Sequence, residues 1–415
     1  MIEKVIRPGM RPAARIQMRK GGNMFGKKEK AENRKREHYS DKIVKYRLRR
    51  FYQGSLIVAA IAAAAAIFWI SQRNRVYTEF TVVESSGRNV SANAKTISLG
   101  DHILTYSNDG AGCFDKKGKA IWNETFEMQD PIVATCNTAI AFGDYNGRKI
   151  YVMNTQNILG EISTNMPIRD LAVAENGVVA AVLDDSDITW IYLYNSKGEA
   201  AVRFKTTMSQ FGYPIDVSLS PDSNLAMVSF VAAEEGGVKS SVAFYNFGEV
   251  GQNEVDNYMS GYDYQAVVPY VRFMTPELAF AVADDRLMFY EGAQKPVSKT
   301  EVLLESEVRS VHHSETYVAL VSYDTTGKNK YVINLYDSMG KVCLSQGFDL
   351  EYRNVVLKDE RVYIYGETGC SIYNLSGVEK FNGVMDESIS LLIPGDSIGK
   401  FTLVGRDSIR EIELK

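Results

Sequence analysis

The pattern of apolar and polar positions changes once along the chain, near residue 76. Before it, residues 51–70 read FYQGSLIVAAIAAAAAIFWI, an uninterrupted uncharged run. Beyond it, short runs rich in Val, Ile, Tyr and Phe alternate with Gly, Asn and Asp turns roughly every 8–12 residues. The first pattern is typical of a membrane-spanning helix, and the second predicts an all-β domain.

The uncharged run is long enough to cross a bilayer as a helix, since about 20 residues span the hydrocarbon core. Phe51 and Tyr52 at one end, with Phe68 and Trp69 at the other, resemble interfacial aromatic belts. A buried core helix is the first alternative, but the flanks are charged. A cleaved secretory signal is the second, but no small-x-small site follows Trp69. We therefore expect an uncleaved signal-anchor over residues 51–70 and a short linker over residues 71–75.

Charge predicts the orientation of this helix. Residues 1–55 carry 17 Lys and Arg against 5 Asp and Glu, a balance of +12; the whole chain has −4, which leaves −16 for the rest. Only Arg73 and Arg75 follow the span closely. Five basic residues stand just before it: Lys42, Lys45, Arg47, Arg49 and Arg50. Because positive charge stays on the cytoplasmic side, we expect a cytoplasmic tail over residues 1–50 and an exported domain beyond the membrane.

The basic tail has two parts. Residues 29–50 have the composition of a charged helix that leads into the membrane, so anionic lipid rather than nucleic acid is the expected surface nearby. A merely solvated tail that sets topology is the alternative. Residues 1–23 are rich in Arg, Pro and Gly and show no periodicity, and we expect the native protein to start at Met24.

One motif recurs seven times after the span. An apolar strand ends in an acidic or amide residue, a short turn with Gly follows, and a second apolar strand begins, as in CFDKKGKAIW at Cys113 and IYLYNSKGEAAVRF at Ile191. The intervals between these anchor residues run from 37 to 51 positions, the period of a four-stranded propeller blade. The anchors are Asp115, Asn154, Asn195, Asn246, Glu291, Asp337 and Asn374.

Each motif predicts the outer hairpin of one blade. The Asp or Asn side chain caps the turn, and Gly takes the positive φ that closes it. Residues 386–415 supply three further strands but no fourth, and residues 76–84, VYTEFTVVE, can supply the missing one. Pairing the first strand with the last three closes the ring and removes its edges. We predict an eight-bladed β-propeller over residues 76–415, or seven blades if the last strands only pad the closure.

The stretch from Asp115 to Trp122, Asp-x-x-Gly-Lys-x-x-Trp, resembles a quinoprotein-type propeller repeat, in which the aromatic residue lies between blades. Tail, signal-anchor and degenerate propeller together resemble a family of uncharacterised membrane-anchored propellers from Gram-positive, clostridium-like bacteria. That resemblance implies no assigned activity. Quinone-binding propellers use a set of tryptophans, and only Trp69, Trp122 and Trp190 occur here, so no quinone or other cofactor is expected.

Residues for catalysis or metal binding are sparse. His312 and His313 are neighbours on a strand and point to opposite faces, so they are poorly placed to share one metal. No nucleophile elbow and no phosphate-binding glycine motif occurs. The cysteines show no CxxC spacing, and we expect free thiols rather than disulfides; the alternative pairs are Cys113–Cys136 and Cys343–Cys370.

Acidic residues gather in the turns between the second and third strands of the predicted blades. Such turns lie on one face of a propeller, where they could contact a cationic partner. Good hairpin chemistry is the alternative explanation for the same residues. The candidate partner-binding residues are Asp109, Asp144, Asp184, Asp185, Asp187, Asp284, Asp285, Asp324 and Asp407.

These patterns favour a protein-binding or scaffolding module held at the cell envelope, with an envelope or membrane protein as its partner. A single-pass sensor that relays ligand binding to the cytoplasmic tail is the second hypothesis. A propeller enzyme is the third, since no convergent set of acids or histidines is evident in the sequence.

Overall fold

The computed structural model describes residues 24–415 except 74, 89–92, 186–187, 207–210, 235 and 398. The chain divides into two units, Met1–Asn74 and Arg75–Lys415. Residues 1–23 lie outside the described part, so the expected start at Met24 stays a prediction.

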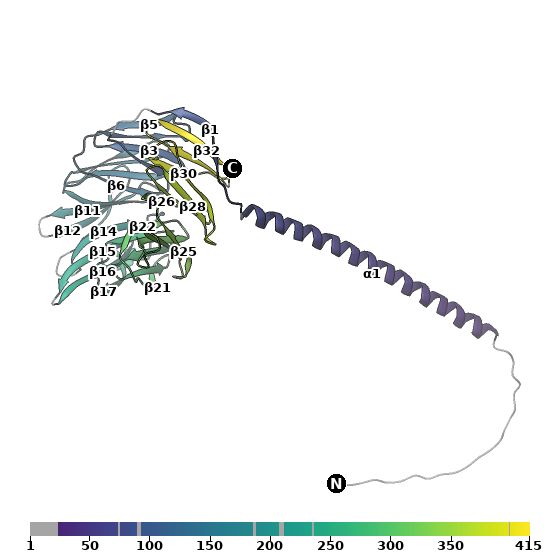
Figure 1. Cartoon of the computed structure of the whole chain (residues 1–415). Coiled ribbons are helices and arrows are strands. Elements are labelled where there is room, and N and C mark those ends of the chain that lie inside the picture. The colour runs from purple at the N-terminus through teal and green to yellow at the C-terminus, as the bar shows by residue number, and fades with distance from the viewer. Residues whose placement is uncertain are drawn as a thin grey trace, which may run out of the picture. The chain divides into compact units, whose positions relative to one another are not determined.

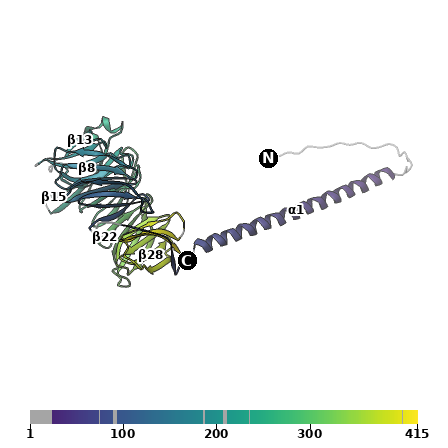
Figure 2. The ribbon, with the colours of Figure 1, turned by 90° about the horizontal axis from the view of Figure 1, so that it is seen from above.

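The first unit contains one helix, α1 (Met24–Arg73), which is drawn without a break in Figures 1 and 2. Its segment Val44–Phe68 is long and apolar enough to span a membrane, and none of it is buried by protein. The helix also continues through residues 71–73, where we expected a linker, because Ser71, Gln72 and Arg73 include no helix breaker.

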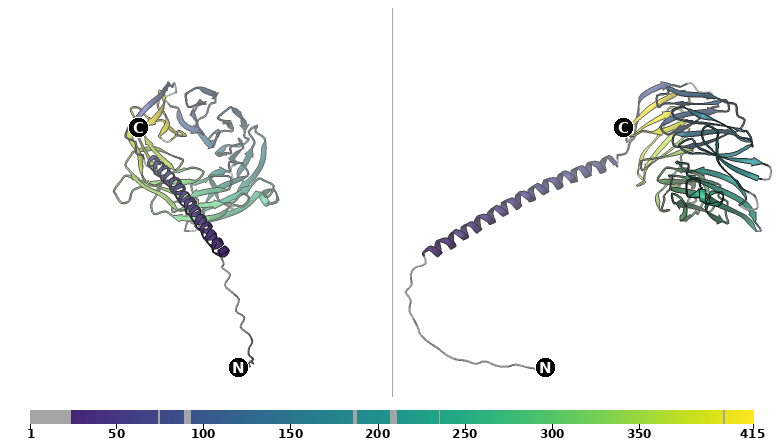
Figure 3. Two further views of the ribbon diagram at one scale, coloured as in Figure 1. Left: turned by 90° about the vertical axis from the view of Figure 1, so that its right-hand side faces the viewer. Right: turned by 180° about the vertical axis from the view of Figure 1, so that it is seen from behind.

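The second unit is an eight-bladed β-propeller, as predicted. Eight four-stranded antiparallel sheets are arranged around a circle, which the left view of Figure 3 shows. We call the strands of each blade A to D from the ring axis outward. Blades 1 to 7 are built from consecutive strands, whereas blade 8 has the order β30–β31–β32–β1. The seven-bladed alternative is therefore wrong.

The first four blades follow in chain order. Blade 1 contains β2 (Lys95–Leu99), β3 (His102–Ser107), β4 (Gly110–Phe114) and β5 (Ala120–Thr125). Blade 2 contains β6 (Pro131–Cys136), β7 (Ala139–Asp144), β8 (Lys149–Asn154) and β9 (Ile158–Ser163). Blade 3 contains β10 (Ile168–Val173), β11 (Val179–Asp185), β12 (Ile188–Tyr194) and β13 (Ala200–Thr206). Blade 4 contains β14 (Tyr213–Leu219), β15 (Leu225–Glu234), β16 (Gly237–Asn246) and β17 (Tyr258–Tyr264), with the short 3-10 helices η1 (Gly251–Asn253) and η2 (Val255–Asn257) before β17.

The last four blades complete the ring. Blade 5 contains β18 (Tyr270–Phe273), β19 (Leu278–Val282), β20 (Arg286–Glu291) and β21 (Val297–Leu303). Blade 6 contains β22 (Val308–His313), β23 (Tyr317–Tyr323), β24 (Tyr331–Asp337) and β25 (Val342–Phe348). Blade 7 contains β26 (Tyr352–Lys358), β27 (Arg361–Gly366), β28 (Gly369–Asn374) and β29 (Glu379–Val384). Blade 8 contains β30 (Leu391–Pro394), β31 (Lys400–Val404), β32 (Ser408–Leu414) and β1 (Phe80–Gly87).

Ring closure joins the start of the propeller to its end. Strand β1 pairs with β32 from Phe80↔Leu414 to Gly87↔Ser408, with one bulge between Val82 and Glu84. The strand starts later than the predicted residue 76, because residues 76–79 make only isolated backbone bonds. Among these, Tyr77 donates its N–H to the Lys380 carbonyl at 2.8 Å.

The predicted turn anchors act as expected in six of seven repeats. In blade 1, Asp115 Oδ1 accepts the N–H groups of Lys117 and Lys119 at 2.9 and 2.8 Å, while Gly118 has a φ of 83°. Asn154, Asn195, Asn246, Asp337 and Asn374 also accept backbone N–H bonds in their turns. Glu291 is the exception, since its carboxylate pairs with Lys299 at 3.0 Å.

Eight clusters of buried apolar residues hold the ring together, one at each interface between neighbouring blades. Trp122 illustrates the packing: it is 8% exposed, and its indole Nε1–H donates to the Asn154 carbonyl of the next blade at 2.8 Å. The aromatic residue of the quinoprotein-like repeat therefore lies between blades, as the resemblance implied. The smallest cluster joins blades 8 and 1 and includes Ile103, Ile393 and Ile409.

The antiparallel order gives the ring two faces. The A–B and C–D turns lie at one end of each sheet, which we call the A–B face. The B–C turns and the connections between blades lie at the other end, the B–C face. Because Tyr77 is bonded at the start of β29 and Glu79 at the end of β32, the chain enters the propeller on its A–B face.

Candidate functional site

Every described member of the predicted acidic set lies in or beside a B–C turn. Asp109 is in the β3–β4 turn, Asp144 ends β7, and Asp184 and Asp185 end β11. Asp284 and Asp285 form the β19–β20 turn, Asp324 follows β23, and Asp407 precedes β32. Asp187 lies outside the described residues. The B–C face thus brings eight of the nine candidates to one end of the ring, on six different blades.

Two of these carboxylates bond to backbone N–H groups. Asp144 Oδ1 accepts those of Gln129 and Asp130, in the connection between β5 and β6, at 3.0 and 2.7 Å. Asp324 accepts bonds from Thr326 and Asn329 in its own turn, and these hydrogen bonds lower its pKa to about 2. The hairpin explanation therefore accounts for Asp324, whereas Asp144 joins two blades.

Two others are paired with arginine. Asp184 bonds to Arg169, whose guanidinium also lies over the Tyr145 ring at 5.2 Å. Asp285 bonds to Arg286 at 2.8 Å, and this hydrogen bond lowers the pKa of the Asp285 carboxyl. Reversing either charge would remove an ion pair that the fold contains, although Arg286 would keep its second partner, Glu301, at 3.1 Å.

The remaining four, Asp109, Asp185, Asp284 and Asp407, are exposed. Within the described part of the chain, their carboxylates make no hydrogen bond or ion pair. They lie on blades 1, 3, 5 and 8, so they are distributed around the ring rather than gathered in one spot. These four carboxylates are therefore the members of the set that do not stabilise the fold through a described hydrogen bond or ion pair.

A second set of acids, not predicted from the sequence, lies on the A–B face. In seven of the eight blades, the A–B turn carries at least one carboxylate. These turns surround one end of the ring axis. Their acidic residues are Asp101, Glu175, Asp222, Glu277, Glu315, Asp359, Glu360 and Asp396. Negative charge is therefore not confined to the B–C face.

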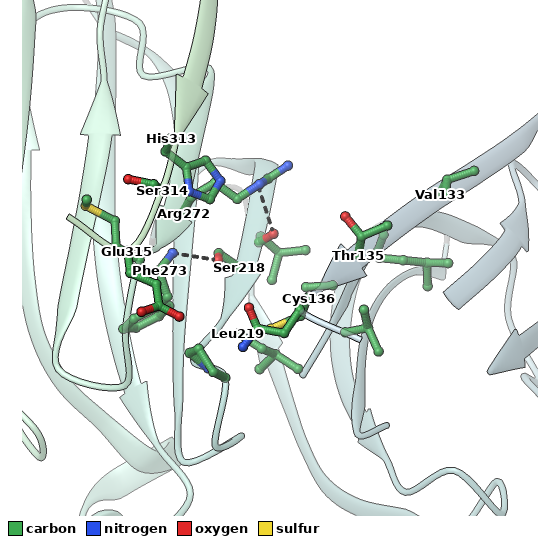
Figure 4. A pocket seen from close by; sticks show the side chains of 18 of the residues that line it. Val133, Thr135, Cys136, Ser218, Leu219, Arg272, Phe273, His313, Ser314 and Glu315 are labelled. Carbon is green, nitrogen blue, oxygen red and sulfur yellow. Dashed lines mark hydrogen bonds between the residues drawn. The ribbon is translucent and has the colours of Figure 1, made fainter. Parts of the chain in front are cut away.

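A cavity of about 730 Å³ lies on the ring axis. The A strands of blades 2 to 7 line it, together with the A–B turn of blade 1. Figure 4 shows Arg272 and His313 on one side of this cavity, with Thr135 and Cys136 across from them. Its apolar wall includes Leu219 and Phe273.

A row of ionisable groups crosses the A strands of blades 3 to 6. Arg272 Nη1 bonds to both oxygens of Asp216, at 2.9 and 3.0 Å, and its guanidinium lies 4.6 Å from the Tyr270 ring centre. Asp216 also accepts the Val271 N–H at 2.7 Å. Burial raises the pKa of Asp216 even though Arg272 opposes it.

Asp170 is the neighbour of this pair on blade 3. Its Oδ1 accepts the Leu171 N–H at 2.8 Å. Burial, reinforced by the nearby Asp216 charge, raises the pKa of Asp170 to about 7. This carboxyl therefore exchanges its proton near neutral pH.

The two adjacent histidines have separate surroundings. His313 lines the cavity and lies against the Phe280 ring, with centroids 5.5 Å apart. His312 bonds through Nε2 to Ser310 Oγ at 3.0 Å. The His313 side chain is exposed only toward the cavity and protein surrounds the rest of the ring, so burial lowers the pKa of both histidines to about 4. Within the described residues, no three His, Cys, Asp or Glu side chains are grouped to hold a metal.

All four cysteines are free thiols. Burial raises the pKa of Cys113 and Cys136 to about 11 and that of Cys370 to about 12. The alternative pairs across neighbouring blades are not formed.

Fold and sequence together define a class: a β-propeller of eight blades, closed by its first strand and preceded by one apolar helix that could span a membrane. The family model for DUF5711, described as a family of unknown function, matches residues 73–414, and the chain belongs to this family. No curated protein matches the chain.

Solved propeller structures resemble the chain at low identity. BamB from Moraxella catarrhalis is 12% identical, with 81% of this chain and 100% of that one covered and a TM-score of 0.46. AztD from Citrobacter koseri is 9% identical, with 72% and 88% covered and a TM-score of 0.49. The Pan2 WD40 domain of Neurospora crassa is 8% identical, with 80% and 95% covered and a TM-score of 0.44.

Proposed function

We propose that the protein is a membrane-tethered propeller that binds a basic protein partner at the cell envelope. The observation that carries this proposal is the division of the B–C acids into two groups. Four serve the fold, through backbone hydrogen bonds or arginine partners, while Asp109, Asp185, Asp284 and Asp407 are exposed and unused. Exposed carboxylates held on rigid hairpins lose little entropy when a cationic surface meets them.

The location of the propeller follows from the charge around α1. The basic residues before the uncharged run at residues 51–70 favour a cytoplasmic N-terminus and an extracytoplasmic propeller. Because the chain enters the propeller on its A–B face, the B–C face is the one opposite the covalent attachment. A partner in the envelope, or the exported part of another membrane protein, fits this arrangement.

Binding through such charges should be fast and sensitive to salt. Exposed ion pairs contribute about 0–1 kcal/mol each, so the four carboxylates steer and orient a partner more than they hold it. The attraction between these carboxylates and a cation is largely screened beyond a Debye length, about 8 Å at physiological ionic strength. It is therefore strongest for a partner whose basic residues match the spacing of the four carboxylates.

The unbroken course of α1 favours a second function. One helix runs from Met24 to Arg73, so the cytoplasmic segment and the span form one continuous element. A helix of this kind could transmit a displacement from the propeller side to the tail, as a single-pass sensor requires. We rank this relay below binding alone, and catalysis below both.

The test compares two charge reversals in the full-length chain. The first variant carries Asp109→Lys, Asp284→Lys and Asp407→Lys on the B–C face. Asp185 is left unchanged because residues 186–187 beside it lie outside the described part of the chain. The matched control carries Glu249→Lys, Glu254→Lys and Glu277→Lys, which are exposed residues of A–B and C–D turns. Both variants keep the arginine pairs and turn bonds intact.

Partners are captured by crosslinking in intact cells and identified by mass spectrometry. We expect the B–C variant to lose the main crosslinked protein and the control to retain it. Equal recovery of that protein by both variants would contradict the proposal. Circular dichroism of the purified chains establishes that both variants are folded.

A further inference from the structure

The axial cavity has the size and lining of a ligand site. Its volume of about 730 Å³ lies within the range of about 300–1,000 Å³ that small-molecule sites occupy. Apolar residues such as Leu171, Phe273 and Met274 line it beside polar and charged ones. A ligand with an apolar body and one polar group fits such a wall.

The charges around the cavity favour a cation. Asp101, Asp170 and Glu315 line it, and Asp216 lies behind Arg272. Arg272 and Lys358 are the cations among the lining residues, which leaves an excess of one negative charge. Asp216, which pairs with Arg272, and Lys116, which pairs with Asp101 at 3.1 Å, leave this balance unchanged. Lys358 is already near Asp101 and Asp396, at 3.7 and 3.5 Å. The acidic A–B turns around the opening strengthen this field.

The fold does not require the charge of Asp170. Asp170, Asp216 and Asn354 occupy the same position in their blades, directly after a bulge between strands A and B. Each uses Oδ1 to accept the N–H of the next residue: Leu171 at 2.8 Å, Val217 at 3.1 Å and Val355 at 2.9 Å. Asn354 makes this bond with an amide oxygen. An uncharged side chain therefore satisfies the structural role.

The carboxylate of Asp216 forms an ion pair with Arg272. Asp170 has no ion pair among the described residues, although it lies beside another carboxylate and is largely enclosed. Burying an unpaired charge destabilises a protein. A carboxylate retained at such a position, on the wall of a cavity, marks a candidate binding group.

We propose that the axial cavity binds a protonated organic amine, whose ammonium group pairs with Asp170 while its apolar part lies against Leu171, Phe273 and Met274. A metal ion is a poorer fit, because the described residues offer no three grouped ligands. The amine can be a free small molecule or a lysine side chain of a partner protein. This site is separate from the B–C turns and does not depend on their function.

The experiment titrates the full-length chain, in detergent micelles, with matched probes. Pentylamine represents the free amine, acetyl-Gly-Lys-Gly-amide represents a lysine side chain, and 1-pentanol is the uncharged control. Calorimetry at pH 8 should give saturable binding of at least one amine probe and none of pentanol at the same concentrations. Binding of pentylamine indicates a small-molecule ligand, and binding of the peptide alone indicates a protein partner.

Two variants test the assigned residues. Asp170→Asn keeps the bond to the Leu171 N–H, because Asn354 makes the same bond to Val355. The variant should weaken amine binding by about tenfold or more, the loss expected for a charge-assisted bond. Thr135→Phe fills the cavity from a side chain that is exposed toward it and should also weaken binding. Glu254→Gln, an exposed residue in the β16–β17 connection and outside the cavity lining, should bind as the parent does.

Wild-type affinity should also fall by about tenfold per pH unit below pH 7, as Asp170 takes up a proton, and Asp170→Asn should lose this dependence. The other titratable and charged groups around Asp170 are common to both chains, so they cancel in the comparison. They are Arg169, Tyr213, Asp216, Tyr270, Arg272, His313, Cys136 and Lys358. Equal affinities of Asp170→Asn and the parent, binding of pentanol as tight as pentylamine, or no saturable binding of any amine overturns the proposal.

Discussion

Replacing Asp170 by Asn should stabilise the propeller, and more so as the pH rises. In the unfolded chain this carboxyl has its ordinary pKa of 3.8, whereas in the folded protein the pKa is about 7. Between these values the folded state holds a proton that the unfolded state has released. The free energy of unfolding of the parent therefore falls as the pH rises from about 4 to about 7.

The magnitude follows from the shift of about three pKa units. At about 1.4 kcal/mol per unit this is about 4 kcal/mol, and water in the cavity reduces it to about 2–4 kcal/mol. The amide introduced by Asp170→Asn cannot ionise, so the variant avoids this loss. With an unfolding entropy of about 2.1 cal/mol/K per residue, a unit of this length should melt about 3–6 °C higher than the parent at pH 8. Near pH 3, below both pKa values, the two chains should melt together, and at pH 5 about a third of the difference should be present.

The assay is thermal unfolding without added ligand, followed by the fluorescence of Trp122 and Trp190 in the propeller. The control is Asp109→Asn, which removes an exposed turn carboxylate and should change stability by less than about 0.5 kcal/mol. A variant that is less stable than the parent at pH 8 refutes the reasoning. So does a gain of the same size at pH 5 and pH 8, because that gain would not come from ionisation.

Three further predictions concern topology, closure and thiol chemistry. Protease added outside intact cells should cut the chain beyond about residue 75 and spare the tail, whereas protection of the propeller would invert the orientation. A chain that begins at Arg88 instead of Arg75 lacks β1 and should lose about 5 kcal/mol or more, since seven residue pairs disappear. Equal melting temperatures would place β1 outside the cooperative fold. Cys370 should react with iodoacetamide at pH 8 far more slowly than the partly exposed Cys343, because Cys370 is buried and its pKa is raised to about 12. Faster reaction of Cys370 would contradict the packing of blade 7.

The blade count could be predicted because the repeat leaves local marks. An Asp or Asn that caps a turn, as Asp115 does, is recognisable from its neighbours alone. The pairing of β1 with β32 also followed, since three strands at the end of the chain lacked a fourth. The helix boundary at Arg73 could not be placed as well, because nothing in residues 71–73 separates helix from linker.

The site was predictable only in part, for a physical reason. Turn acids could be assigned to one face, but whether each was free depended on arginines elsewhere in the fold, such as Arg169 for Asp184. The axial row was missed because Asp170, Asp216 and Arg272 belong to three different blades. One signal was available: polar residues interrupt the inner strands at matching positions, in Ile168-Arg-Asp, Pro214-Ile-Asp and Tyr352-Arg-Asn.

Closure of the ring by its first strand also sets the order in which the propeller can be completed. Thr81 Oγ1 donates to the carbonyl of Glu413, 332 positions away, and closing a loop of that length costs about 5 kcal/mol of chain entropy. The seven residue pairs of β1 and β32 contribute a similar amount, at about 1 kcal/mol each. Pairing alone therefore barely favours closure, and the apolar cluster between blades 8 and 1 must add to it. Since that cluster is the smallest of the eight among the described residues, we expect the ring to open first at this interface, beside the strand nearest the anchor.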